Sequence, residues 1–111
     1  MKRHFTALGR LKTGEMNKTE QMYAQRLDWM LKDGFIQWYK FEGVKLKLAD
    51  NTFLTVDFFV LNKDNELEAH EVKGGFITDD ARVKLKVAAA MYPFKFFQWQ
   101  FKNKQWHVTE Y

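Results

Sequence analysis

The sequence of 111 residues contains no cysteine and no serine, and its only proline is Pro93. The lack of cysteine excludes disulfides, thiolate nucleophiles and zinc sites built on cysteine, and the lack of serine excludes a Ser–His–Asp triad. No apolar run approaches the ~18 residues of a membrane span, and residues 1–14 have no apolar core typical of a signal peptide. We therefore expect a cytoplasmic protein with no membrane association.

The chain is rich in apolar and basic residues. Hydrophobic residues make up 46% of it and aromatic residues 17%, enough for one folded domain of this length. The net charge of +4 and the pI of about 9.3 are compatible with a polyanionic partner. Residues 1–16 are interpreted as a basic N-terminal arm or a frayed terminus, and residues 17–111 as the domain.

A helix is predicted to begin after Asn17 and to end at Asp33, with Gly34 as its C-terminal cap. Glu20 stands three residues after Asn17, the spacing of a capping box. The apolar stripe of this helix consists of Tyr23, Ala24, Leu27, Met30 and Leu31. Glu20 lies on the same stripe and is expected to point toward whatever the helix packs on, although it could serve only as a capping partner.

Beyond Gly34 the apolar pattern has the period of strands. The predicted extended segments are Phe35–Phe41 with Val44–Leu48, Phe53–Leu61, Glu66–Lys73, Phe94–Phe101 and Gln105–Tyr111. A second helix begins at Thr78 or Asp79 and ends at Tyr92, before Pro93. The order α-β-β-β-α-β-β predicts a single α/β domain with a mixed central sheet flanked by helices.

Asp57 is the only charge in the apolar segment Phe53–Leu61. A carboxylate buried without a partner is costly, so a cation is expected to compensate it. Glu71 and Lys73 are two residues apart on the next strand and therefore share one face. Asp57 could also form a structural ion pair with Lys73, and His70 is expected on the strand surface.

The register of this hairpin decides whether the two carboxylates meet. A four-residue loop over 62–65 with symmetric pairing sets Asp57 opposite His70, which leaves Asp57 and Glu71 on opposite faces. A β-bulge, or a loop one residue longer or shorter, aligns Asp57 with Glu71. We predict such an irregularity.

If Asp57, Glu71 and Glu20 converge, they form an all-oxygen site suited to Mg²⁺ or Mn²⁺. A cation held there can polarise a phosphodiester and lower the pKa of a bound water. Lys73 beside it can stabilise the charge that develops in the transition state. The pattern predicts metal-dependent phosphodiester hydrolysis.

These residues resemble the PD-(D/E)XK nuclease superfamily, which has the restriction-endonuclease-like fold. Glu20 matches its helix-borne glutamate, Thr55-Val56-Asp57 its aspartate strand and Glu71-Val72-Lys73 its (D/E)-x-K element, with Lys84 or Lys86 on the following helix. The resemblance spans Asn17 to Trp99 and is closest to small phage-encoded endonuclease and Holliday-junction-resolvase-like domains. Val56 departs from the family's proline, which many members lack.

The resemblance implies a role for each matched residue. Asp57 and Glu71 would be metal ligands, Glu20 a ligand or an orienter of a metal-bound water, and Lys73 the catalytic ammonium. The cofactor would be Mg²⁺ or Mn²⁺. A phage-encoded protein would act in the cytoplasm of the host cell.

Substrate contact requires further cations near this site. The candidates are Arg82, Lys84 and Lys86 on the second helix and Arg10 and Lys12 in the arm, although the helix charges could be only a solvated face. The expected function is a Mg²⁺-dependent DNA endonuclease, with branched or nicked duplexes among its candidate substrates and a homodimer as its candidate assembly. The alternatives are an inactive nucleic-acid-binding or protein-interaction module on the same fold, and an RNA-directed nuclease.

Overall fold

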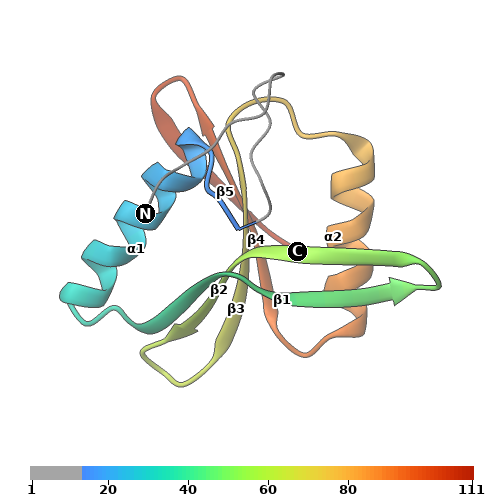
Figure 1. Ribbon diagram of the computed structural model, residues 1–111, viewed down its shortest axis with the longest axis horizontal. Coiled ribbons are helices and arrows are strands. Elements are labelled where there is room, and N and C mark those ends of the chain that lie inside the picture. Colours follow the sequence, from blue (N-terminus) through green and yellow to red (C-terminus); the bar gives the residue numbers. More distant parts are fainter. Residues whose placement is uncertain (1–13) are drawn as a thin grey trace.

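The structure is a computed structural model that describes residues 14–111. Most of the expected basic arm, with Arg10 and Lys12, therefore lies outside the described residues. The elements follow the predicted order (Figure 1): α1 (Lys18–Lys32), β1 (Ile36–Ala49), β2 (Thr52–Asn62), β3 (Leu67–Lys73), α2 (Asp79–Met91), β4 (Lys95–Lys102) and β5 (Gln105–Glu110). Within the described residues, neither helix is long and apolar enough to cross a membrane.

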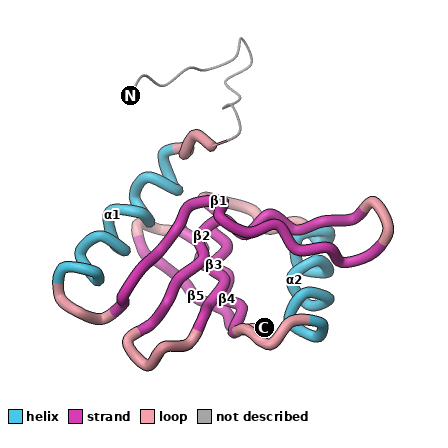
Figure 2. The backbone as a smooth tube through the Cα atoms, turned by 60° about the horizontal axis from the view of Figure 1, so that its bottom comes forward, coloured by secondary structure: helices cyan, strands magenta, loops and turns pink. Residues whose placement is uncertain are grey.

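The strands form one five-stranded sheet in the order β1-β2-β3-β4-β5 (Figure 2). Only β3 and β4 are parallel, and α2 connects them, while the other neighbouring strands are antiparallel. The expected α/β class with a mixed sheet is confirmed.

Both helices begin at the caps that the sequence predicts. The Glu20 N–H donates to Asn17 Oδ1 at 2.8 Å, and the Asn17 N–H donates to Glu20 Oε1 at 2.9 Å, which completes the capping box. Gly34 has a φ of 79°, and the following Phe35 N–H bonds the Met30 carbonyl at 2.8 Å, as at a glycine-terminated helix end. The second helix is capped by Thr78, whose Oγ1 accepts from the Ala81 N–H.

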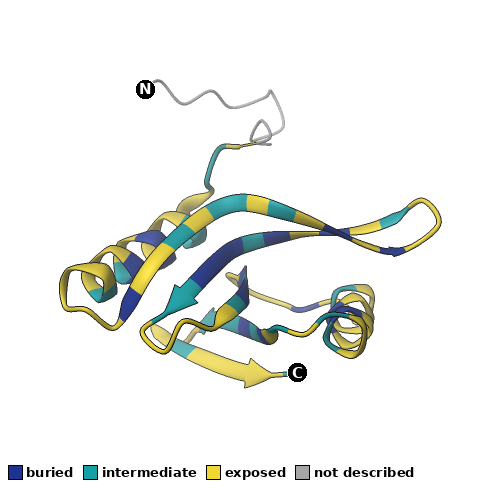
Figure 3. Cartoon of the chain, turned by 90° about the horizontal axis from the view of Figure 1, so that it is seen from below, coloured by how far each residue is buried: buried dark blue, intermediate teal, exposed yellow. Residues whose placement is uncertain are grey.

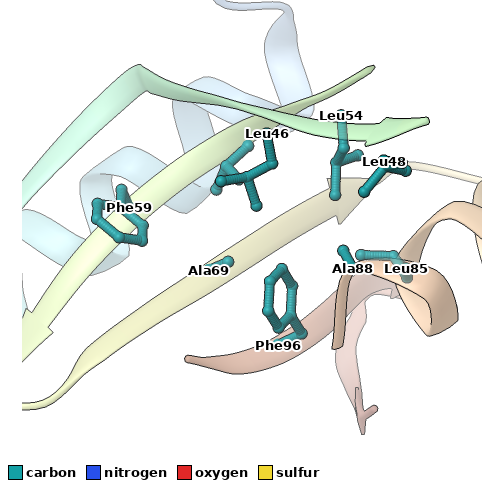
Figure 4. Packing of buried hydrophobic residues seen from close by; sticks show 9 residues of the cluster. Leu46, Leu48, Leu54, Phe59, Ala69, Leu85, Ala88 and Phe96 are labelled. Carbon is teal, nitrogen blue, oxygen red and sulfur yellow. The ribbon is translucent and has the colours of Figure 1, made fainter. Parts of the chain in front are cut away.

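The sheet separates two hydrophobic cores, because successive strand residues point to opposite faces. The α1-side core consists of Tyr23, Ala24, Leu27, Ile36, Phe58, Val60 and Val72. The α2-side core consists of Leu46, Leu48, Leu54, Val56, Phe59, Ala69, Leu85, Ala88 and Phe96 (Figure 4). On each helix the buried residues lie on the side that meets the sheet (Figure 3). Leu31, expected on the buried stripe, is exposed.

A β-bulge bends the β1–β2 hairpin near its middle. Phe41 pairs with Phe58 and Val44 with Val56, so that Glu42 and Gly43 together face the single residue Asp57. A bulge increases local twist and redirects a strand. Beyond it, the outer half of the hairpin extends across α2 (Figure 1), where its leucines complete the α2-side core.

From the sequence we expected His70 on the strand surface, and this expectation is wrong. The side chain is buried under α1 with 4% exposure. The Tyr23 hydroxyl lies 2.6 Å from His70 Nδ1, and His70 Nε2 lies 2.8 Å from Glu68 Oε1. Because an ionised carboxylate only accepts hydrogen bonds, Nε2 donates to Glu68, and in the neutral imidazole Nδ1 then accepts from the Tyr23 hydroxyl. Burial raises the pKa of the Tyr23 hydroxyl, which keeps it a donor. These bonds tie α1 to β3 through the α1-side core.

Replacing the buried tyrosine tests this connection. Tyr23→Phe leaves His70 Nδ1 without a donor in a dry site, so the free energy of unfolding in urea is expected to fall by about 1–3 kcal/mol. Tyr39→Phe is the matched control, because the Tyr39 hydroxyl bonds Asp28 at 2.6 Å where water can replace it. Its loss is expected to be below about 1 kcal/mol. Equal losses in the two variants would contradict the role assigned to Tyr23.

Candidate functional site

The β2–β3 hairpin has the register that brings Asp57 and Glu71 together. Leu61 pairs with Leu67 and Phe58 with His70, so five residues separate the last paired positions, one more than in the symmetric alternative. The next position along the hairpin sets Asp57 opposite Glu71. Of the irregularities that the sequence allowed, the longer loop is the one that forms between these strands, and pairing of Asp57 with His70 is excluded.

Asn62 organises the longer loop. Its side-chain Oδ1 accepts from the Asp64 N–H at 2.9 Å and from the Glu66 N–H at 3.0 Å. Asn65 has a φ of 65°, a left-handed conformation that asparagine tolerates better than most residues. The loop chemistry therefore sets the register on which the site depends.

Asp57 and Glu71 exchange hydrogen bonds with each other's strand. The Asp57 N–H donates to Glu71 Oε2 at 2.7 Å, and the Val72 N–H donates to Asp57 Oδ2 at 2.8 Å. Backbone pairing of β2 with β3 ends one position earlier, at Phe58 and His70. We call these two bonds the crossed carboxylate pair. It replaces the backbone ladder at the point where β2 diverges from β3, and it holds both carboxylates on one face.

The crossed carboxylate pair favours a protonated form. Burial raises the pKa of Asp57 to about 7, and the negative charge of Glu20 adds to the rise, although the Val72 N–H opposes it. Burial and the neighbouring Asp57 charge also raise the pKa of Glu71. Two close carboxylates in a partly dry site cannot both ionise at low cost, so the pair retains a proton near neutral pH unless a cation is present.

A pocket of about 380 Å³ opens beside the pair. It lies where β2 leaves β3, between the N-terminal turns of α1 and α2. Its lining residues are Asn17, Glu20, Leu54, Asp57, Glu71, Val72, Lys73, Gly74, Thr78, Asp80, Ala81, Lys84, Leu85 and Gln98. The four residues expected to be catalytic therefore line one pocket.

Glu20 does not join the two carboxylates as a third close ligand. Its Oε1 is held by the capping box, although its charge acts on Asp57 and it lines the pocket. Over residues 14–111, no three His, Asp or Glu side chains are grouped closely enough to hold a metal ion. The expected meeting of three carboxylates is thus reduced to a close pair, with Glu20 at the pocket wall.

Lys73 lies on the same face of β3 as Glu71 and lines the pocket. Its positive charge lowers the pKa values of Asp57 and Glu71 and so partly offsets their rise. Among the ion pairs of the described chain there is none between Asp57 and Lys73, so the alternative of a structural ion pair is not observed. The next residue, Gly74, lies directly against Thr19, and a Cβ atom at position 74 would clash with the threonine side chain. This close approach places the end of β3 beside α1.

The expected substrate-binding cations are not all at the pocket. Lys84 lines it, and its Nζ donates to the Phe53 carbonyl at 3.3 Å. Arg82 and Lys86 are not among the lining residues, because they lie on the other flank of α2.

Two polar residues of the pocket were missed from the sequence, Asp80 and Gln98. Asp80 follows the N-cap of α2, where an acidic residue usually indicates only a helix start. Gln98 gave only a weak signal, because a second glutamine, Gln100, follows it two residues later in the same strand.

The donor set fits a hard divalent cation. Both close side chains are carboxylates, the remaining polar neighbours are mainly oxygen donors, and the described residues contain no cysteine. Mg²⁺ and Mn²⁺ prefer such ligands and retain several waters when few protein ligands are available. Asp57 and Glu71 are the residues that would hold the cation.

The raised pKa of Asp57 predicts a stability effect with a definite sign. Because the folded protein binds this proton more tightly than the unfolded chain, stability is lost as the pH rises from the ordinary value of 3.8 to about 7. Asp57→Asn keeps an acceptor for the Val72 N–H and removes the repulsion. Without divalent cations, the melting temperature of the variant relative to the unsubstituted protein is expected to be higher at pH 8 than at pH 4. A difference that does not change with pH would contradict the assignment.

Comparison of the chain with family models, with curated proteins and with solved structures finds no match. The resemblance to PD-(D/E)XK nucleases therefore rests on the residues of this chain. Those residues, and the pocket that brings four of them together, are the basis for a functional proposal.

Proposed function

We propose that the protein is a Mg²⁺-dependent DNA endonuclease with a restriction-endonuclease-like fold, able to use Mn²⁺ in place of Mg²⁺. The observation that carries the proposal is the crossed carboxylate pair at the mouth of a polar pocket, with Lys73 two residues beyond Glu71. A raised carboxylate pKa in a cleft is typical of a functional site.

Asp57 and Glu71 would hold the divalent cation, and binding would release the proton that the pair retains near neutral pH. When bound, the cation supplies charge neutralisation on a phosphodiester and lowers the pKa of a water. Lys73 donates hydrogen bonds from its ammonium group to the attacking water or to the phosphoryl oxygens. Glu20 orients water from the opposite wall of the pocket through its carboxylate.

The positive charges favour DNA over a small phosphate ester as the proposed substrate. The chain has a net charge of +4, and Lys84 stands at the pocket wall. Phosphate contacts by lysine and arginine release counterions, which makes binding salt-dependent. One centre cuts one strand, so cleavage of both strands of a duplex, or of a branched junction, would use a homodimer.

Cleavage of supercoiled and branched DNA in Mg²⁺, Mn²⁺ or EDTA tests the proposal. Asp57→Asn and Glu71→Gln are expected to abolish cleavage, and Lys73→Ala to lower the rate by about 100-fold or more. Lys32→Ala, at the far end of α1, is the control for a lost positive charge and is expected to cleave normally. Mg²⁺-supported cleavage that persists in Asp57→Asn and Lys73→Ala would refute the assigned roles.

The alternative is an inactive nucleic-acid-binding or protein-interaction module on the same fold. It is favoured by the finding that only two carboxylates meet closely within residues 14–111. A nuclease is expected to show a higher melting temperature in millimolar Mn²⁺, as linkage requires for a ligand of the folded state. An unchanged melting temperature with salt-sensitive DNA binding and no cleavage would indicate the module. Matched RNA and DNA substrates distinguish an RNA-directed nuclease.

A further inference from the structure

Gln98 presents a buried amide oxygen that no group of the described chain satisfies. The residue lies on β4 with 2% exposure, and its Oε1 has no hydrogen-bond partner within residues 14–111. In the parallel register of β3 and β4, Gln98 is the partner of Glu71, so the two side chains share a face. Gln98 also lines the pocket beside the crossed carboxylate pair.

An unpartnered amide oxygen in a dry site is unfavourable. Leaving a buried acceptor unsatisfied costs about 1–3 kcal/mol, and folded proteins rarely do so without a reason. Two other glutamines of the sheet use their amide nitrogens in hydrogen bonds: Gln37 Nε2 donates to Asn65 Oδ1 at 2.6 Å, and Gln100 Nε2 to the Gly75 carbonyl at 2.6 Å. The position therefore calls for a partner that enters the pocket.

The chemistry of the pocket identifies that partner. Asp57 and Glu71 supply negative charge for a divalent cation, and an amide carbonyl is an oxygen ligand of the kind that Mg²⁺ and Mn²⁺ accept. We propose that Gln98 is a third oxygen donor of the divalent-cation site, acting on the cation or on one of its waters. It supplies the third oxygen that the sequence pattern offered to Glu20 as a ligand, while Glu20, whose Oε1 is held by the helix cap, keeps only the role of orienting water. This inference rests on the proposed function.

The second orphaned atom of the described chain does not suggest the same role. Trp99 Nε1 is a donor, which cannot bind a cation, and it follows Gln98 on the opposite face of β4. Its ring packs with the α1-side core and lies 4.2 Å from the Arg26 guanidinium carbon. Only Gln98 combines an unsatisfied acceptor with a place in the pocket.

Gln98→Met tests the inference, because methionine preserves the length of the side chain and removes the oxygen. The melting temperature without divalent cations is expected to stay equal or rise, since an unsatisfied group is lost. The Mn²⁺ concentration that gives half of the thermal shift at pH 8 is expected to rise by about tenfold or more, as for the loss of an outer-shell partner. Both readouts are independent of DNA cleavage.

Gln37→Met is the matched control, because it removes a satisfied amide far from the pocket. It is expected to lower the melting temperature and to leave the Mn²⁺ midpoint unchanged. A Gln98→Met protein that takes up Mn²⁺ like the unsubstituted chain would overturn the role of Gln98 and leave the nuclease proposal standing. A lowered melting temperature with an unchanged midpoint would do the same and mark a structural residue. If the unsubstituted chain takes up no Mn²⁺, with or without DNA, both proposals fail.

Discussion

The crossed carboxylate pair is the constraint on which the rest of the structure depends. Where β2 leaves β3, the backbone N–H groups of Asp57 and Val72 lose their strand partners and are satisfied by carboxylates instead. This exchange lets the outer half of the β1–β2 hairpin turn over α2 and complete the α2-side core. It also leaves both acidic groups beside an open pocket. One pair of side chains thus replaces a strand pairing at its end, lies opposite the bulge that bends the hairpin, and forms the candidate site.

Sequence patterns predicted the elements well because each rests on local chemistry. The capping box at Asn17, the glycine after α1 and the turn residues between strands act over a few positions. Asp57 was found because a charge in an apolar strand must be compensated. The register that sets Asp57 opposite Glu71 could not be predicted from the sequence. The choice between a connection of four and of five residues depends on the hydrogen bonds of the Asn62 side chain.

Other residues of the site depended on tertiary contacts that no local pattern encodes. The position of Glu20 suggested both a helix cap and a metal ligand, and the structure shows that the cap holds one of its oxygens. His70 looked like a surface residue because its partner Tyr23 is 47 positions away. Gln98 carried a weaker signal than Asp57, because Gln100 is a second polar residue in the same strand and an uncharged amide costs less to bury than a carboxylate. The flank of α2 that faces the pocket could be assigned only after its packing against the sheet was known.

The strand order of the sheet, which follows the order of the chain, has a consequence for how the protein folds. Every antiparallel pair joins neighbours along the sequence, and only the β3–β4 pairing must wait for a helix to be traversed. Short loops close at little entropic cost, and topologies rich in such contacts fold fast. The two acidic groups come from one hairpin, so they can meet in the nascent chain before α2 and β4 have docked. Because burial is the largest cause of their raised pKa values, their repulsion becomes costly only when α2 and β4 enclose the pair, and protons or divalent ions in the surrounding solution would relieve it at that stage.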